Sequence, residues 1–495
     1  MAKSFQATRM KRKRKSAACD TQIQIGNMDD QIEEKGPFIT DLPKPVFWNI
    51  LLKLPTRSIL ICKCVCKTWR ARISDPEFAN LHFAQAEPCP LLSLLGPTPT
   101  RVPRTLYLVE PEDRSGFDLK DCACAATGNA CDQSHVHMKL TKYKIPLRND
   151  EEVINNNSDN GNVMPNGNRG TKRKTCIRIP PHHHKYNVVN SCNGLLLLSE
   201  PIHNDPAVVC NPVTGEFIDL PESSRPHQNI RIPVECGLGF SSETNEYKVI
   251  RIFEAEAGYS FKFAEIHTLG TGSWKSIGEV SETAGNLVSP TYAKGVLYWY
   301  ESYGYRIRSF DLNTEKFKSV PSPPFPIKQF MYVGMGVLEG CLCLCDSYGD
   351  LITVWTLTDS GGKHRWTKVI AIDKDDSGRW PYGVYTAMKY YKSYGLFMFH
   401  SQTNSFFYYH PEKPSSYVYL KLCGFKANFQ AISHVPSFIL LKDILAGKDV
   451  EVLNINTRCA GLKLQGETRA LSLKEEIAEF ESDPFSSDNY CFSDE

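Results

Sequence analysis

The feature that most constrains the fold is a repeat between Tyr186 and Leu422. Each copy opens with a short apolar strand, usually led by glycine, runs through turn residues, and ends with an aromatic residue, two spacers and an aliphatic residue. The opening strands begin at Gly194, Glu246, Gly295, Gly340 and Gly395. The aromatic residues that end the copies are Phe217, Trp274, Phe317, Trp366 and Tyr417.

A period of about 50 residues, built from short apolar strands joined by glycine and asparagine turns, predicts four-stranded propeller blades. One blade cannot cover both faces of its own sheet, so neighbouring blades must stack in a ring. The repeat accounts for five blades. We expect a further blade to combine strands of residues 104–147 with strands around residues 434–444 and so close the ring. The alternative is an open sandwich, which explains the strands but not the period.

Residues 39–83 precede the repeat and predict three or four short helices. Thr40 or Asp41 can cap the first helix, whose first turn tolerates Pro43. Apolar residues then recur at helical spacing until Pro55 ends the helix, namely Phe47, Ile50, Leu51 and Leu54.

Three further short helices are expected in the same segment. The first would carry Ile59 and Leu60, the next would place Val65, Trp69 and Ile73 on one side, and Asp75 with Pro76 would open the last. A unit of about 45 residues is too small to bury an adequate core alone. Its apolar surface is therefore covered either by a partner protein or by the chain's own downstream domain, and amphipathicity does not separate the two.

The motifs of this segment resemble the F-box in its plant form. They are Leu42-Pro43, ILLKLP at 50–55, VCKTWR at 65–70 and ISDPEF at 73–78. The resemblance implies docking on the Skp-type adaptor, and through it on the cullin, of a ubiquitin ligase. It also implies which residues form the adaptor-binding surface or the small core behind it: Leu42, Pro43, Ile50, Leu51, Leu54, Pro55, Leu60, Val65, Cys66 and Trp69.

The repeat region resembles a second family. SCNGLLLL at 191–198, VCNPVTGEFIDLP at 209–221 and GVLYWY at 295–300 are similar to the F-box-associated, kelch-like domain of plant F-box proteins. The expected fold class is therefore multidomain, a small all-α F-box followed by an all-β kelch-like propeller. The expected boundaries are a disordered basic tail at 1–36, the F-box at 37–85, a proline-rich linker at 86–103, the propeller at 104–445 with a disordered insertion at about 149–180, and a C-terminal segment at 446–495.

Charge and cysteine content bear on the compartment. The formal net charge of +2 indicates neither nucleic acid nor membrane as a partner, and we expect neither. The 18 cysteines, without a secretory signal in the sequence, favour free thiols in a reducing compartment, the nucleus or the cytoplasm. A basic run is either a nuclear import signal or a plain solvated tail; it consists of Lys11, Arg12, Lys13, Arg14 and Lys15.

Candidate metal ligands are few. Cys122, Cys124, Cys131, His135 and His137 match no common structural zinc spacing, so free thiols in a loop are the better interpretation. Cys341, Cys343 and Cys345 alternate along a strand and are expected to be small buried residues. Cys62, Cys64 and Cys66 are likewise expected to be packing residues. We expect no metal, no cofactor and no catalytic residues.

The sequence thus predicts a non-catalytic, substrate-recognition subunit of an SCF-type ubiquitin ligase, whose propeller binds an unidentified target protein. Candidate anchors for that target are Tyr303, Tyr305, Trp380 and Tyr382. The alternatives are an F-box interaction scaffold that does not promote degradation and, less favoured, a metal-dependent propeller enzyme. The C-terminal tail, from Leu473 on, is acidic and expected to be solvated.

Overall fold

The computed structural model describes residues 42–94, 105–110, 139–146, 186–201, 203–223, 234–254, 261–280, 286–301, 306–324, 332–360, 363–374, 380–391, 395–412, 417–421 and 428–455. The basic run at 11–15, the cysteine and histidine cluster at 122–137, and Tyr303 and Tyr305 lie outside these ranges. None of the helices within them is long and apolar enough to cross a membrane.

Four short helices come first: α1 (Lys44–Leu51), α2 (Thr56–Cys62), α3 (Lys67–Ile73) and α4 (Pro76–Gln85). The N-cap of α1 is Pro43 itself, so Thr40 and Asp41 precede the helix and fall outside the described residues. Asp75 opens α4 as predicted, because its carboxylate accepts a hydrogen bond of 2.9 Å from the Glu77 N–H.

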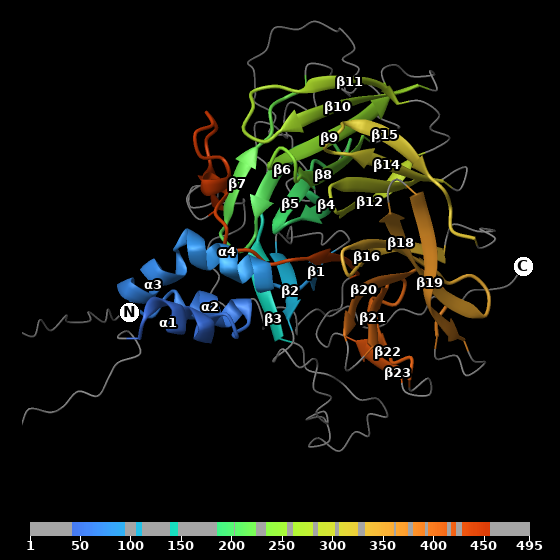
Figure 1. Ribbon diagram of the computed structural model, residues 1–495, viewed down its shortest axis with the longest axis horizontal. Coiled ribbons are helices and arrows are strands. Elements are labelled where there is room, and N and C mark those ends of the chain that lie inside the picture. Colours follow the sequence, from blue (N-terminus) through green and yellow to red (C-terminus); the bar gives the residue numbers. More distant parts are fainter. Residues whose placement is uncertain are drawn as a thin grey trace, which may run out of the picture.

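The strands form six small antiparallel sheets arranged as a six-bladed propeller (Figure 1). The first blade holds β4 (Asn187–Cys192), β5 (Leu195–Ser199), β6 (Pro206–Asn211) and β7 (Glu216–Asp219), and β25 (Leu453–Asn454) extends its outer edge. The second holds β8 (Glu235–Ser241), β9 (Glu246–Glu254), β10 (Lys262–Thr268) and β11 (Lys275–Val280).

The third blade holds β12 (Leu287–Ala293), β13 (Val296–Glu301), β14 (Ile307–Asp311) and β15 (Lys316–Val320). The fourth holds β16 (Val333–Leu338), β17 (Cys341–Asp346), β18 (Leu351–Ser360) and β19 (Lys363–Asp373). The fifth holds β20 (Tyr385–Tyr391), β21 (Gly395–His400), β22 (Ser405–Tyr409) and β23 (Tyr417–Lys421). The apolar strand of each predicted repeat is the second strand of its blade, which confirms the period.

The sixth blade closes the ring. It consists of β24 (Phe429–His434), β1 (Cys89–Leu94), β2 (Thr105–Glu110) and β3 (Lys139–Lys144). β24 pairs antiparallel with β1 along its whole length, from Cys89 opposite His434 to Leu94 opposite Phe429. A blade shared between the two ends of the domain was predicted, and the pairing confirms it.

Two details of that prediction are wrong. Residues 441–444 form a short helix, α6 (Leu441–Ile444), instead of a strand. Residues 86–103, which their prolines indicate as a linker, contain β1. Pro90 of β1 lies opposite Ser433 of β24 and has no N–H to donate. An antiparallel pair uses only alternate N–H groups of each strand, so β1 can contain a proline and still pair with β24.

His434 joins the closing blade to the first one. Its side chain is buried, and its Nδ1 lies 2.9 Å from the hydroxyl of Ser191 on β4. Burial lowers the pKa of the His434 imidazole to about 3. Because a histidine in the unfolded chain has a pKa of about 6.5, the unfolded state takes up a proton at a pH where the folded state does not.

We therefore predict that His434 makes the protein less stable as the pH falls from about 6.5 towards 3, by roughly 1.4 kcal/mol per pH unit. Replacing it in His434→Gln should remove that share of the pH dependence, measured by chemical denaturation at neutral pH and one unit below 6.5. The matched control is Ser191→Ala, which should lower stability at both pH values and keep the slope. An unchanged slope in His434→Gln would contradict the prediction.

Candidate functional site

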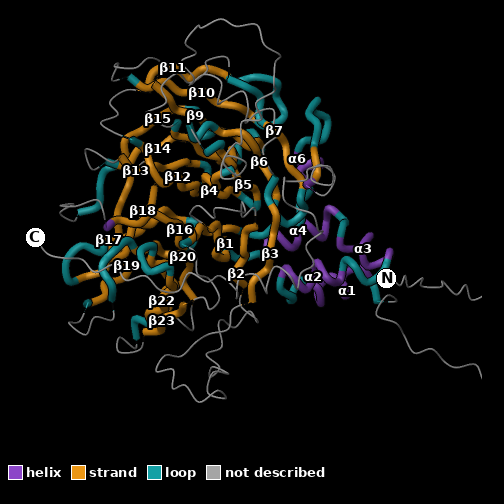
Figure 2. Tube along the Cα trace, turned by 180° about the vertical axis from the view of Figure 1, so that it is seen from behind, coloured by secondary structure: helices purple, strands orange, loops and turns teal. Residues whose placement is uncertain are grey.

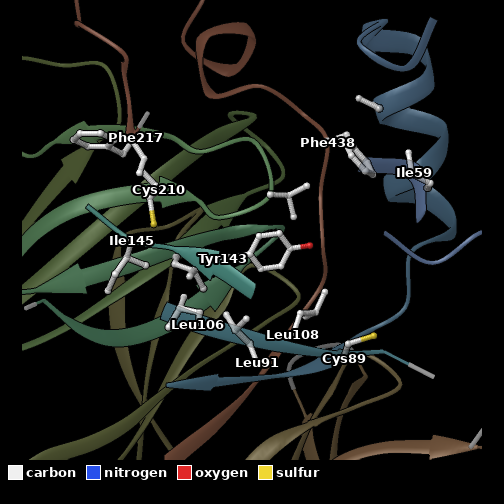
Figure 3. Close-up of a cluster of buried hydrophobic side chains, with 14 of the residues drawn as sticks. Ile59, Cys89, Leu91, Leu106, Leu108, Tyr143, Ile145, Cys210, Phe217 and Phe438 are labelled. Atoms are coloured by element: carbon white, nitrogen blue, oxygen red, sulfur yellow. The ribbon is translucent and has the colours of Figure 1, made fainter. Parts of the chain in front are cut away.

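The four helices and the ring share one hydrophobic core. Figures 1 and 2 show α1–α4 beside β3 and β7 at one side of the propeller. The core contains Phe47, Leu51, Ile59 and Phe78 of the helices together with residues of the ring. Figure 3 shows part of this cluster, in which the ring contributes Leu91, Leu106, Leu108, Tyr143, Cys210 and Phe217. The downstream domain thus covers the inner face of the helices, one of the two options that the sequence left open.

The chain that follows the closing strand also enters this core. Phe438 lies four residues beyond β24, and its ring centroid is 6.2 Å from that of Phe78. The edge of its ring meets His82 of α4, at 4.8 Å between centroids. Aromatic pairs in this range of distances stabilise a packed interface beyond the area they bury. Helices from the start of the chain and a segment from its end therefore hold each other in place.

Glu110 of β2 fixes α2 to the ring. The N-cap of α2 is Pro55, which has no side-chain cap to offer. Glu110 Oε1 accepts a hydrogen bond of 2.9 Å from the Thr56 N–H, and Oε2 accepts one of 3.5 Å from the Thr141 hydroxyl on β3. A carboxylate beside the first N–H groups of a helix also interacts favourably with the helix dipole. A buried residue of the ring thus supplies the cap that α2 lacks.

The ten residues predicted to bind an adaptor divide into three groups. Leu51 is fully buried in the shared core. Leu42, Leu54, Leu60 and Trp69 are partly buried and pack against that core, and Pro55 is also half-buried. Those exposed to solvent are Pro43, Ile50, Val65 and Cys66. The expectation that Val65 shares one side of a helix with Trp69 and Ile73 is wrong, because Val65 precedes α3 and is 62% exposed, whereas Ile73 is buried.

Two more exposed aliphatic side chains of α1 and α2 were missed. Val46 is 45% exposed and lies one helical turn before Ile50 on α1, which is 42% exposed. Ile61 is 59% exposed near the end of α2. The spacing of Val46 and Ile50 was visible in the sequence, but the buried face of α1 could not be told from its outer face without the ring. These four residues, Val46, Ile50, Ile61 and Val65, are called the aliphatic face below.

The cysteines of this region are not all packing residues, contrary to expectation. Cys62 is half-buried and contacts the shared core, and burial raises the pKa of its thiol. Cys64 and Cys66 are exposed. Cys66 is the N-cap of α3, where its sulfur accepts a hydrogen bond of 3.5 Å from the Trp69 N–H.

Comparison with known proteins identifies both parts of the chain. The family model described as "F-box domain" matches residues 39–81, and the one described as "F-box associated beta propeller domain" matches residues 155–439, more than half of the chain. The chain belongs to the F-box proteins with an F-box associated beta propeller.

Its relatives include three F-box proteins of Arabidopsis thaliana. F-box protein CPR1 is 31% identical over 68% of this chain and 74% of its own length. F-box protein At3g07870 is 24% identical over 68% of this chain and 74% of its own. F-box/kelch-repeat protein At3g23880 is 24% identical over 67% of this chain and 79% of its own.

Two acidic side chains of the F-box, Asp75 and Glu77, share one lysine. Lys44 Nζ lies 2.7 Å from Asp75 Oδ2 and 3.7 Å from Glu77 Oε2. The hydrogen bond with Asp75 raises the pKa of Lys44, and the same contact lowers the pKa of Asp75. Lys44 also lies over the ring of Trp48, at 4.3 Å from its centroid. These contacts join the start of α1 to the start of α4.

A second surface lies where the chain enters the inner strand β20. The F-box contacts Phe438, just beyond the end of the inner strand β24, and Glu87, just after α4, forms an ion pair with Lys389 near the end of β20. The F-box therefore lies at the end of β20 and Tyr382 at its start, so the two surfaces are at opposite ends of the ring. Tyr382 is 72% exposed there, and Tyr348 is also exposed. Lys374 lies 5.2 Å from the Tyr382 ring centroid and donates a hydrogen bond of 3.0 Å to the Gly349 carbonyl. We call Tyr348, Lys374 and Tyr382 the aromatic rim.

Trp380 does not belong to the aromatic rim. It is buried and stacks on Phe407 at 5.3 Å between ring centroids, so its selection as a target anchor is wrong. Tyr382 is exposed as an anchor must be, and Tyr348 was missed because nothing in the turn between β17 and β18 marked it out.

The cysteines of the fourth blade lie in or beside its core. Cys343 and Cys345 are buried in the core between the fourth and fifth blades, as predicted, and burial raises the pKa of the Cys345 thiol to about 12. Cys341 is half-buried and lies 3.4 Å from Lys294 Nζ. Within the described ranges, no group of three or more His, Cys, Asp or Glu side chains is arranged to hold a metal ion.

We predict that Glu110→Ala loosens the F-box from the ring, because it removes the cap of Thr56 and the bond to Thr141 together. The expected loss is about 1–3 kcal/mol, seen as faster hydrogen exchange of the α2 amides. The control is Glu243→Ala, which replaces an exposed glutamate in the turn between β8 and β9. Equal protection of α2 in both variants would show that Glu110 does not hold the helix.

Proposed function

We propose that this F-box protein is the substrate-recognition subunit of an SCF-type ubiquitin ligase. Its F-box binds a Skp-type adaptor and through it a cullin, and its propeller binds a target protein. Membership of the F-box family supports this role. The observation that carries it is the aliphatic face, because Val46, Ile50, Ile61 and Val65 stay exposed on a unit whose largest apolar side chains, among them Phe47, Trp48 and Phe78, are buried against the ring.

The aliphatic face suits a helical partner. Exposed aliphatic side chains from α1, from α2 and from the turn after α2 offer anchors to a groove or helix of another protein. Interfaces of this kind concentrate their energy in a few apolar anchors. Leu51, Leu54 and Trp69 would then contribute to adaptor binding indirectly. They belong to or contact the shared core and hold α1 and α3 in position.

In this proposal the chain is not a catalyst. Thioester and ligation chemistry belongs to other subunits, and this chain contributes proximity. Because the F-box and the ring share one core, a target on the propeller is held at a nearly constant distance from the adaptor. That rigidity raises the effective concentration of a target lysine beside charged ubiquitin.

The target is proposed to bind at the aromatic rim. Tyr348 and Tyr382 are exposed on a framework of buried hydrogen bonds, in which the Ser347 hydroxyl donates to the Tyr332 carbonyl at 2.9 Å. Tyrosines held by a rigid framework make good anchors, because little side-chain entropy is lost on binding. The aromatic rim and the F-box lie at opposite ends of the ring, so both partners can bind at once.

The adaptor half of the proposal is tested with a matched pair of double variants. Ile50→Ala with Val65→Ala removes two anchors of the aliphatic face, and Leu351→Ala with Val369→Ala removes two side chains of similar exposure from the fourth blade, 42% and 47%. A loss of about 2 kcal/mol corresponds to roughly thirtyfold weaker binding of a purified Skp-type adaptor in the first variant alone. Equal affinity of the two variants, or no binding by the wild type, would refute the docking surface.

The target half is tested by protein half-lives. Tyr348→Ala with Tyr382→Ala should leave adaptor binding intact and slow the degradation of the same proteins as the Ile50→Ala and Val65→Ala variant, measured by pulse-chase. The two variants should affect the same proteins because degradation requires the chain to bind both the adaptor and the target. If adaptor binding is normal and neither variant changes any half-life, the chain is an interaction scaffold that does not promote degradation.

A further inference from the structure

The F-box surface carries positive charge that its own acids do not neutralise. Residues 37–85 contain three acidic residues, Asp41, Asp75 and Glu77, and the last two are held by Lys44. The same residues contain seven cationic side chains, so the formal net charge is +4. Four of them are exposed and have no carboxylate partner among the described residues: Lys53, Arg57, Lys67 and Arg70. The F-box therefore favours an acidic partner.

These cations lie close to the aliphatic face along the chain. Lys53 follows Ile50 by three residues, Arg57 precedes Ile61 by one helical turn, and Lys67 follows Val65 by two residues. Arg57 and Ile61 both belong to α2, and side chains four positions apart on a helix are neighbours on its surface. The F-box thus presents aliphatic and cationic groups close together, which matches a segment that mixes carboxylates with apolar side chains.

The chain itself contains such a segment. Residues 474–495 hold eight acidic residues and one lysine, a formal net charge of −7. Apolar side chains are placed among the acids, including Ile477, Phe480, Phe485 and Phe492. Charge and apolar content are therefore complementary to those of the F-box.

The described chain ends beside the F-box. Ile455 is buried in the same core cluster as Phe47 and Leu51 of α1, and its N–H donates a hydrogen bond of 2.9 Å to the Gly215 carbonyl. The 18 residues from 456 to 473 can span up to about 60 Å when extended, which is ample for a return to α1 and α2. A segment tethered this closely has an effective concentration of the order of millimolar, so a weak contact is enough.

We propose that residues 474–495 bind to the aliphatic and cationic surface of the F-box and compete there with the adaptor. The competition rests on the proposed function, whereas the binding of the segment does not. The F-box would then be partly occupied by its own chain until an adaptor displaces it. Since the cations are exposed, the contact weakens as salt screens the charges.

The binding is tested with the chain shortened to residues 1–473 and a fluorescein-labelled peptide of residues 474–495. Fluorescence anisotropy should show binding that weakens with added salt. Lys67→Glu with Arg70→Glu should weaken it about tenfold or more, because attraction becomes repulsion. Lys316→Glu with Lys368→Glu, which reverses two exposed lysines of the ring, should leave it within about twofold.

The inference is overturned if the peptide does not bind, or if a scrambled peptide of the same composition binds as tightly. It is also overturned if replacement of residues 11–15 by glutamine abolishes binding while the F-box variant does not. The last result would mean that residues 474–495 bind the basic run at residues 11–15 instead of the F-box.

The competition is tested by the affinity of a purified Skp-type adaptor for the full chain and for residues 1–473. Removal of the tail should tighten adaptor binding about tenfold or more at low salt, and the difference should shrink as salt is added. Equal affinities would overturn the competition. If neither chain binds the adaptor, the proposed function fails, while the peptide measurement still decides whether the tail binds the F-box.

Discussion

The pairing of β24 with β1 is the constraint on which the rest of the structure depends. A ring of blades stays closed when both ends of the domain are fastened in one blade. This chain meets the requirement with a blade that takes one strand from residues 429–434 and three from residues 89–144. Because α4 ends at Gln85 and β1 begins at Cys89, the closing blade also brings the F-box directly against the ring.

Rigidity between the two domains follows from that closure. The F-box has too few residues to bury its own apolar side chains, and the closing blade offers them Leu91, Leu106 and Leu108. Phe438, on the C-terminal side of β24, packs against Phe78 of α4, and Glu110 supplies the missing cap of α2. A receptor that must hold a target at a set distance from an adaptor gains from such a joint, whereas a flexible linker would spread the target over many positions.

The outer surface of the F-box is left with two properties, exposed aliphatic groups and unneutralised positive charge. The first property alone would suit many apolar partners. Together they select partners that carry carboxylates beside apolar side chains, since like charges across an interface are costly. The acidic C-terminal segment has this composition, as a docking adaptor would need to have, which is the physical basis for competition between them.

The sequence by itself determined the blades. Each copy of the repeat shows its apolar strands and turns without reference to distant residues, and the copies recur at a period of about 50 residues. The sequence also determined that residues 39–83 form short helices, through Pro43, Pro55 and the Asp75-Pro76 cap. Only the tertiary structure decided which side of α1 is buried, why Val65 is exposed and Trp380 is not, and that residues 89–94 are a strand instead of a linker. Those outcomes depend on contacts between residues far apart in the chain, such as Cys89 with His434 and Thr56 with Glu110, which no local pattern records.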